Sequence, residues 1–219
     1  MKAETGPAKL PPLSSGVPSG SILHDKRWVA PSDGQTVLHS EAWYDFENSR
    51  ARTDWFNTPT SPAEGAATIP TKAANPSILA AEVWDHGRHQ SYNGYSNTVL
   101  PADTGQPLGG PDQWPTQDIV RLGQQTLNGK TVDVYRADLN IPRGQERSAD
   151  FGLIYVDSTS GLRVREEWLV GSPGSAYVAH LYAYDLVPRT DELARYLSIG
   201  SLDELVTGTS TKGTSAPRP

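Results

Sequence analysis

The sequence contains no cysteine, which excludes thiol catalysis, disulfide bonds and cysteine-ligated zinc. No stretch approaches the roughly 18 consecutive apolar residues that a membrane-spanning helix needs, and no apolar segment follows Met1 and Lys2 as in a signal peptide. Basic residues are outnumbered, with 19 Lys and Arg against 25 Asp and Glu and a net charge of −6. We therefore expect neither a nucleic-acid partner nor a membrane span in this chain.

Apolar residues are also scarce, at 36% of the chain, whereas glycine and proline are abundant, at 20 and 18 residues. This balance favours many short strands joined by turns over long helices. At 219 residues the chain is long enough for one domain. We predict a disordered, proline-rich leader over residues 1–20, a single β-rich domain over 21–206 and a disordered tail over 207–219. The leader is either a tether to a membrane anchor or a frayed end.

Turn signals at short intervals predict successive β-hairpins. The clearest hairpin joins Ile119–Leu127 to Lys130–Leu139 through Asn128-Gly129, the preferred pair for a type I′ turn. Val132 and Val134 alternate with polar residues, as in a half-buried strand. Further strands are predicted at Thr36–Tyr44, Arg50–Phe56, Ile78–Trp84, His89–Tyr95, Asn97–Leu100, Phe151–Val156, Leu162–Val170 and Tyr177–Val187.

The last of these strands is apolar on both faces, and such a strand is usually covered on both sides, by a helix or by a bound molecule. Helix signals are few, although Thr190 can cap a short helix from Asp191 to about Leu197. Residues 58–77 and 101–116, rich in proline, are predicted as loops. The sequence therefore predicts a mainly β, antiparallel domain.

Chemistry is suggested most strongly by Asp85-His86-Gly87-Arg88-His89, where two histidines flank a turn signal. No third ligand is apparent nearby, so we interpret this segment as a hairpin turn and expect no metal site. Glu166 and Glu167 are adjacent carboxylates, but neighbouring strand residues face opposite sides and cannot form a glycosidase pair. We expect them to pair with arginines across strands, with Glu166 on the face of Trp168 and with Arg163, Arg165 and Glu167 on the other.

The sequence has no motif of a serine hydrolase, a nucleotide-binding loop or a zinc protease. His39 and His180 lie in predicted strands beside aromatic residues, and we interpret them as packed rather than catalytic. Six tryptophans and nine tyrosines suit either stacking on a sugar or base, or packing in the core. We therefore expect no catalytic residues and no cofactor.

Four hairpin signatures follow one another along the chain, with patterns such as E-x-W-x-D … R-x-R and x-G-K-x-V-x-V-Y. They occupy Ser40–Asp45 with Ser49–Arg52, Glu82–Gly87 with Tyr92–Val99, Asn128–Tyr135, and Tyr155–Arg165. Together they resemble hairpins of the lipoprotein-carrier superfamily, which includes LolA-, LppX- and RseB-like proteins, and of its membrane-anchored actinobacterial relatives of unknown function. The likeness covers roughly residues 36–187.

The resemblance implies a single curved antiparallel sheet, a half-barrel of successive hairpins, with short helices or loops covering an apolar cavity. Members of this superfamily hold lipids or lipoprotein acyl chains outside the cytoplasm and are not enzymes. The superfamily has no fixed cavity motif, so strand alternation alone names our candidates for an apolar binding face: Trp43, Trp84, Val132, Val134, Leu153, Tyr155, Val164, Trp168 and Leu181.

Three hypotheses follow from the sequence. The first is a non-enzymatic extracytoplasmic domain that binds a lipid, a lipoprotein acyl chain or another apolar ligand. The second is an envelope-associated regulatory module that binds a protein partner through a sheet edge or face. The third is a sugar or cell-wall hydrolase using groups such as Glu166 and His86. Without the resemblance, a cytoplasmic location is expected.

Overall fold

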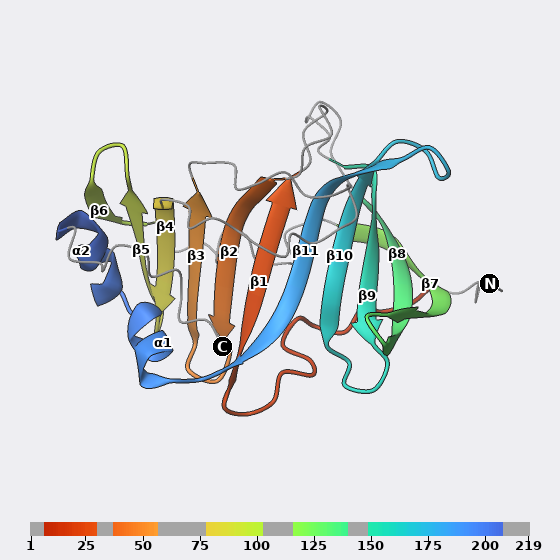
Figure 1. The fold of residues 1–219 in the computed structure, drawn as a ribbon, viewed down its shortest axis with the longest axis horizontal. Coiled ribbons are helices and arrows are strands. Elements are labelled where there is room, and N and C mark those ends of the chain that lie inside the picture. The colour runs from red at the N-terminus through yellow and green to blue at the C-terminus, as the bar shows by residue number, and fades with distance from the viewer. Residues whose placement is uncertain (1–6, 30–36, 57–77, 103–115, 140–148, 208–219) are drawn as a thin grey trace.

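The structure, a computed structural model, describes residues 7–29, 37–56, 78–102, 116–139 and 149–207 (Figure 1). These residues form an antiparallel sheet of eleven strands with two short helices. The strands are β1 (Ser21–Val29), β2 (Val37–Asp45), β3 (Arg50–Phe56), β4 (Ile78–Asp85), β5 (Arg88–Asn93), β6 (Thr98–Pro101), β7 (Thr116–Leu127), β8 (Lys130–Leu139), β9 (Phe151–Asp157), β10 (Arg163–Val170) and β11 (Tyr177–Pro188). The sheet is curved and open, which confirms the predicted mainly β fold.

Strands that are neighbours in the sheet are also neighbours in the sequence, except at one junction. The order is β6-β5-β4-β3-β2-β1-β11-β10-β9-β8-β7, so that two meanders meet where β1 pairs with β11. This pairing is long, running from Ser21 opposite Pro188 to Val29 opposite His180. The first and last strands therefore join the two halves of the sheet, and β6 and β7 form its edges.

Strand β1 was missed by the sequence analysis, which expected the sheet to begin near Thr36. Its central run Asp25-Lys26-Arg27 has the composition of an exposed loop. Two of these charged residues are nevertheless buried on the same face, where Arg27 Nε donates a hydrogen bond to Asp25 Oδ2 at 2.6 Å. A charge pair inside a strand hides the alternation that identifies a buried strand.

The hairpin turns follow the predicted chemistry. Asn128 and Gly129 both have positive φ, 50° and 77°, as a type I′ turn requires. His86 and Gly87 repeat this at 50° and 81° between β4 and β5. The interpretation of the His86 segment as a hairpin turn is therefore confirmed.

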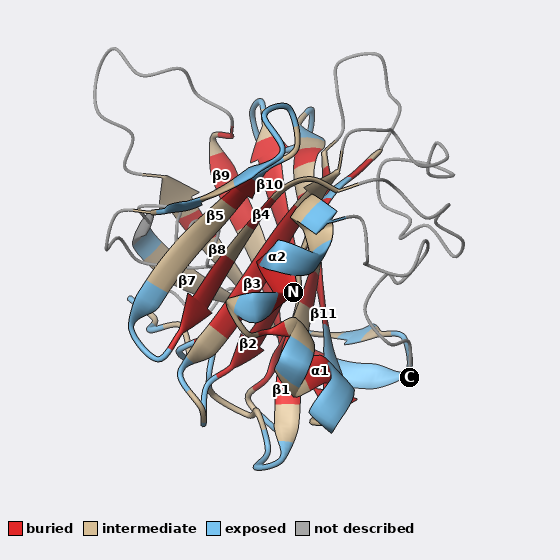
Figure 2. Cartoon of the chain, turned by 90° about the vertical axis from the view of Figure 1, so that its left-hand side faces the viewer, coloured by how far each residue is buried: buried red, intermediate tan, exposed pale blue. Residues whose placement is uncertain are grey.

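One face of the sheet, here called the helix face, is covered at one end by the two helices that follow β11 (Figure 2). Helix α1 (Asp191–Tyr196) begins after Thr190, whose Oγ1 accepts a hydrogen bond from Leu193 N at 3.2 Å, as predicted. Its buried Leu193 and the following Leu197 pack on Ile22, Trp43 and Val187 of the sheet.

Helix α2 (Gly200–Thr207) packs further toward the β6 edge. Its Leu202 is fully buried among Ala81, Val83 and Tyr92. Neither of the helices in the described residues has the length and apolar character that crossing a membrane requires.

The other face, here called the opposite face, carries the main apolar cluster of the sheet. Residues 7–20 pack onto this cluster, because Leu13 is only 4% exposed and Arg163 Nη2 donates to the Pro11 carbonyl at 2.9 Å. The same segment reaches the β7 edge, where Pro7 forms a bridge with Val120. Residues 7–20 of the predicted disordered leader therefore pack on the sheet, because scattered leucines suffice to cover an apolar patch. The start of the predicted leader and nearly all of the predicted tail and of the two predicted loops lie outside the described residues, at 1–6, 208–219, 57–77 and 103–115.

Candidate binding site

The nine apolar residues named from strand alternation do not share one surface. Trp43 lies on the helix face beneath α1, and Leu181 lies in a separate cluster on that face. Trp84 and Trp168 belong instead to the main apolar cluster of the opposite face. The remaining five residues, here called the Tyr155 cluster, lie together on strands β8 to β10: Val132, Val134, Leu153, Tyr155 and Val164.

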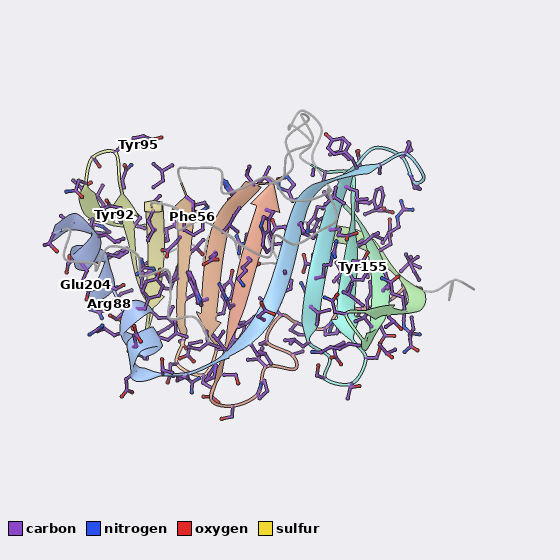
Figure 3. All side chains as sticks on the ribbon, in the orientation of Figure 1. Phe56, Arg88, Tyr92, Tyr95, Tyr155 and Glu204 are labelled. Carbon is purple, nitrogen blue, oxygen red and sulfur yellow. The ribbon has the colours of Figure 1, made fainter. Side chains whose placement is uncertain are left out.

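The Tyr155 cluster lies toward the β7 edge, well away from Tyr92 beside α2 (Figure 3). The cluster is bordered by an ion pair to which the Tyr155 hydroxyl is hydrogen-bonded. The Tyr155 hydroxyl donates to Glu167 Oε2 at 3.0 Å, and Arg165 Nη2 lies 2.5 Å from Glu167 Oε1. Burial and the neighbouring carboxylate raise the pKa of Tyr155, so its hydroxyl remains a donor. This cluster is therefore apolar and mostly buried, and the Tyr155 hydroxyl within it already has a hydrogen-bond partner.

On the opposite face, Asp25 and Arg27 form a buried ion pair with exposed fractions of 0% and 7%. Arg27 Nη2 also donates to the Tyr44 hydroxyl at 2.8 Å. Burial raises the pKa of the Asp25 carboxyl, and the adjacent guanidinium offsets this only in part. The pair is thus held in a place from which water is excluded.

Glu166 forms the second buried group on this face. It accepts hydrogen bonds from Arg163 Nη1 and from Trp168 Nε1, both at 3.1 Å. Burial raises the pKa of the Glu166 carboxyl, and the nearby Arg163 opposes this rise only in part. Glu166 shares a face with Trp168, as predicted, but Arg163 was wrongly assigned to the other face because a β-bulge between Arg163 and Arg165 shifts the alternation. Glu166 and Glu167 do pair with arginines, although those of their own strand.

Several buried atoms on the opposite face have no hydrogen-bond partner in the part of the chain that the structure describes, and four of them lie close to one line across the sheet. They come from four successive strands, β3, β2, β1 and β11, and we call them the polar row: Thr53 Oγ1, Ser40 Oγ, Asp25 Oδ1 and Tyr184 Oη. Their residues are 1%, 0%, 0% and 4% exposed.

The register of the sheet places these atoms in line. Thr53 and Asp25 both lie opposite Ala42 of β2, and Asp25 lies opposite Tyr184 of β11. Cross-strand partners share a face, so three of the four side chains form one straight row. Ser40 follows two residues from Ala42 on the same face.

Beyond Thr53 the row continues to Glu82 of β4, whose Oε2 lies 3.5 Å from His89 Nε2. Burial raises the pKa of the Glu82 carboxyl, and the nearby His89 opposes this rise. The His89 ring is stacked on Trp84 with centroids 3.8 Å apart. An acidic group and an aromatic surface therefore close the β4 end of the row.

An unsatisfied buried hydrogen-bonding group costs about 1–3 kcal/mol. Four such groups in one row therefore lower the stability of the folded state unless a bound group completes their hydrogen bonds. Burial raises the pKa of Tyr184 well above its ordinary value, so its hydroxyl both donates and accepts at neutral pH. The row offers hydroxyl and carboxylate oxygens for a bound polar group.

The arrangement does not supply the groups of the hydrolase hypothesis. Glu166 lies on β10 and His86 beside β4, five strands away in the sheet order, or about 24 Å at the usual strand spacing. The hydroxyls of the polar row have no histidine hydrogen-bonded to them among the described residues. Among the described residues, no side chain is hydrogen-bonded to Ser40 or Thr53 in a way that would activate its hydroxyl as a nucleophile.

No protein-family model matches the sequence, and no curated protein sequence matches it. Solved structures with a similar course of the chain include an uncharacterized conserved protein from Thermus thermophilus, with a TM-score of 0.46, 9% identity and coverage of 81% of this chain and 85% of that one. A chain of the Pseudomonas aeruginosa MucA/MucB complex has a TM-score of 0.44 and 16% identity over 83% of this chain and 56% of that one, so this chain spans little more than half of its length. LprF from Mycobacterium bovis has a TM-score of 0.38 and 10% identity over 78% of this chain and 88% of that one.

A LolA superfamily protein from Nitrosomonas europaea is also among the similar structures, with a TM-score of 0.34 and 10% identity over 88% of this chain and 93% of that one. At these TM-scores the likeness assigns no ligand, partner or site residue to this chain.

Sequence reasoning missed the polar row and the Asp25–Arg27 pair. Polar residues at alternate positions in a strand, such as Asp25 and Arg27, or Ser40 two residues before Ala42, were the available signal. Polar residues at alternate positions are, however, typical of a strand that faces solvent on that side. Only the pairing of β1 with β2 and β11 brings these side chains together on one face, and all of them are buried there.

Proposed function

We propose that this chain is a non-catalytic extracytoplasmic binding domain that holds a lipid, a lipoprotein acyl chain or another amphipathic ligand against the opposite face of its sheet. One observation carries the proposal: the main apolar cluster of that face borders four buried polar atoms without hydrogen-bond partners among the described residues. Buried polar atoms left without partners on four neighbouring strands are unusual in a face that serves stability alone. Unsatisfied polar atoms beside apolar side chains suit a ligand that has both characters.

The site residues follow from this choice of face. Trp84 and Trp168, two of the residues predicted from alternation, border the proposed ligand. The Tyr155 cluster stays a predicted second apolar surface. The hairpin signatures that resemble the lipoprotein-carrier superfamily support an apolar or acyl ligand and a location in the cell envelope.

The proposal is tested by native mass spectrometry of the protein after incubation with a lipid extract. We expect a retained amphipathic molecule and a rise in Tm, since a ligand at 100 times its Kd stabilises the folded state by about 2.7 kcal/mol. Tryptophan fluorescence should change on titration, because Trp84 and Trp168 border the site. No retained molecule and an unchanged Tm with phospholipids, fatty acids and glycolipids would refute it.

A protein partner is a second candidate, favoured by the β7 edge. Ala8 N donates to the Ile119 carbonyl at 2.8 Å, so this edge already accepts a short extended segment. An edge that accepts one strand can accept another from a partner. A partner recovered at equal stoichiometry and free of lipid, and lost on substitution of the β7 edge, would support this alternative.

A further inference from the structure

We propose that the polar row binds the hydroxyl groups of a neutral, polyhydroxylated headgroup, so that the amphipathic ligand is recognised by its head as well as by its apolar part. This inference rests on the proposed function and specifies the class of ligand. It is supported directly by four buried atoms on four successive strands that have no hydrogen-bond partner in the described chain: Thr53 Oγ1, Ser40 Oγ, Asp25 Oδ1 and Tyr184 Oη.

The dimensions of the row suit a group with several hydroxyls. Strands lie about 4.8 Å apart, so four successive strands spread the atoms over about 14 Å. A single water or a single alcohol reaches only one or two of them. Trp55 is the cross-strand partner of Ser40 and is half-buried, so an aromatic ring flanks the row on the same face.

The hydrogen-bonding character of the row selects a neutral ligand group. The hydroxyls of Ser40, Thr53 and Tyr184 each donate and accept, whereas an ionised Asp25 only accepts. A ligand hydroxyl can donate to the carboxylate and accept from its neighbours. An ammonium group would leave the protein hydroxyls without an acceptor.

The charges that face the row disfavour an anion. Asp25 lies within it, and Glu82 lies opposite Thr53. Burial raises the pKa of the Glu166 carboxyl, and Asp25 adds to this rise. The cationic groups of this face are already engaged: Arg27 with Asp25 and Tyr44, and Arg163 with Glu166 and the Pro11 carbonyl. A phosphate or sulfate would therefore approach carboxylates without a free guanidinium to pair with it.

The first experiment compares two amphiphiles with the same alkyl chain, dodecyl maltoside and dodecylphosphocholine, both below their critical micelle concentrations. Binding is measured by isothermal titration calorimetry on the whole chain. We expect the maltoside to bind at least about tenfold more tightly, the effect of one or two additional hydrogen bonds.

The second experiment uses the variants Tyr184→Phe, Ser40→Ala and Thr53→Val, each of which removes a hydroxyl that has no partner in the described chain. Maltoside affinity should fall about five- to tenfold for each, while dodecylphosphocholine affinity changes less than twofold. Removing an unsatisfied group does not weaken the fold, so Tm should stay equal or rise. Tyr177→Phe, on an exposed tyrosine of the same strand, is the matched control and should change neither affinity.

The outcomes separate this inference from the proposed function. Equal binding of both amphiphiles, unaltered by the three variants, would keep the proposed function and overturn the headgroup site. The same holds if the row contains ordered water only and the variants leave selectivity unchanged. Binding of neither amphiphile, nor of any lipid, would overturn both.

Discussion

Strand β3 carries buried polar side chains on both faces of the sheet, and the two faces use them differently. Arg52 and Asp54 point to the helix face, and Thr53 between them points to the opposite face. All three are about 1% exposed. Burial alone therefore does not distinguish them, and the difference lies in their partners: of the Arg52 nitrogens only Nη2 lacks one among the described residues, whereas the single side-chain oxygen of Thr53 has none.

On the helix face the polar groups connect the sheet to the helices. Arg52 donates to Asp54 Oδ1 at 2.7 Å, to Ser201 Oγ at 2.6 Å and to the Tyr196 carbonyl at 3.1 Å. Its guanidinium lies 3.8 Å from the centre of the Tyr196 ring, and the Tyr196 hydroxyl donates to Asp54. These groups have a structural role, because they hold α1 and α2 in place.

On the opposite face Thr53 Oγ1 and the rest of the polar row have no such partners among the residues described. A buried side chain that makes hydrogen bonds to several other elements therefore indicates a structural role, whereas a line of buried atoms without any such bond indicates a candidate site. Four substitutions test this distinction.

The largest effect is expected for Arg52→Leu. It leaves the buried Asp54 carboxylate without its cation, and breaking a buried ion pair costs about 3–5 kcal/mol. Urea unfolding should show this loss, and hydrogen exchange in α1 and α2 should accelerate most. Arg88→Leu is the control, because the Arg88 side chain is 71% exposed and its pair with Asp85 should contribute less than about 0.5 kcal/mol. A loss below about 1 kcal/mol for Arg52→Leu would contradict the structural role.

The hairpins were predictable because their turn chemistry is local. Asn128-Gly129 and His86-Gly87 need positive φ, and these residue types supply it wherever they stand. The polar row was not predictable, since Thr53, Asp25 and Tyr184 are brought into line only by the pairing of β3 with β2, of β2 with β1 and of β1 with β11, the last across more than 150 residues of sequence. Alternation also assigned Arg163 to the wrong face, because a bulge leaves no reliable mark in the sequence.

The next largest effect is expected for Tyr44→Phe, on the opposite face itself. The Tyr44 hydroxyl accepts from Arg27 Nη2, and hydrogen bonds to charged groups contribute about 1.5–3 kcal/mol. The free energy of unfolding should fall by that amount in urea titration. Equal stability of the variant and the parent would show that hydroxyls on this face lack structural roles even where they have partners.

A smaller loss, about 1 kcal/mol, is expected for Thr190→Ala, which removes the N-cap of α1. Thr190→Ser keeps the oxygen that accepts from Leu193 N and should retain most of the stability. Thermal unfolding of the pair measures how far α1 depends on its own cap rather than on Arg52. If both variants lost as much stability as Arg52→Leu, packing around Thr190 and not the hydrogen bond would be responsible.

The smallest effect on stability, close to zero or slightly favourable, is expected for Tyr184→Phe. Tyr184 and Tyr44 are both buried tyrosines on the opposite face, 4% and 5% exposed, but only the Tyr44 hydroxyl has a hydrogen bond in the described chain. Removing a hydroxyl with no partner also removes its desolvation cost, so the folded state loses nothing. Urea unfolding of the two Phe variants side by side therefore measures the distinction directly. If Tyr184→Phe cost as much as Tyr44→Phe, the Tyr184 hydroxyl would be structural, and the polar row would lose the member that lies nearest to β10.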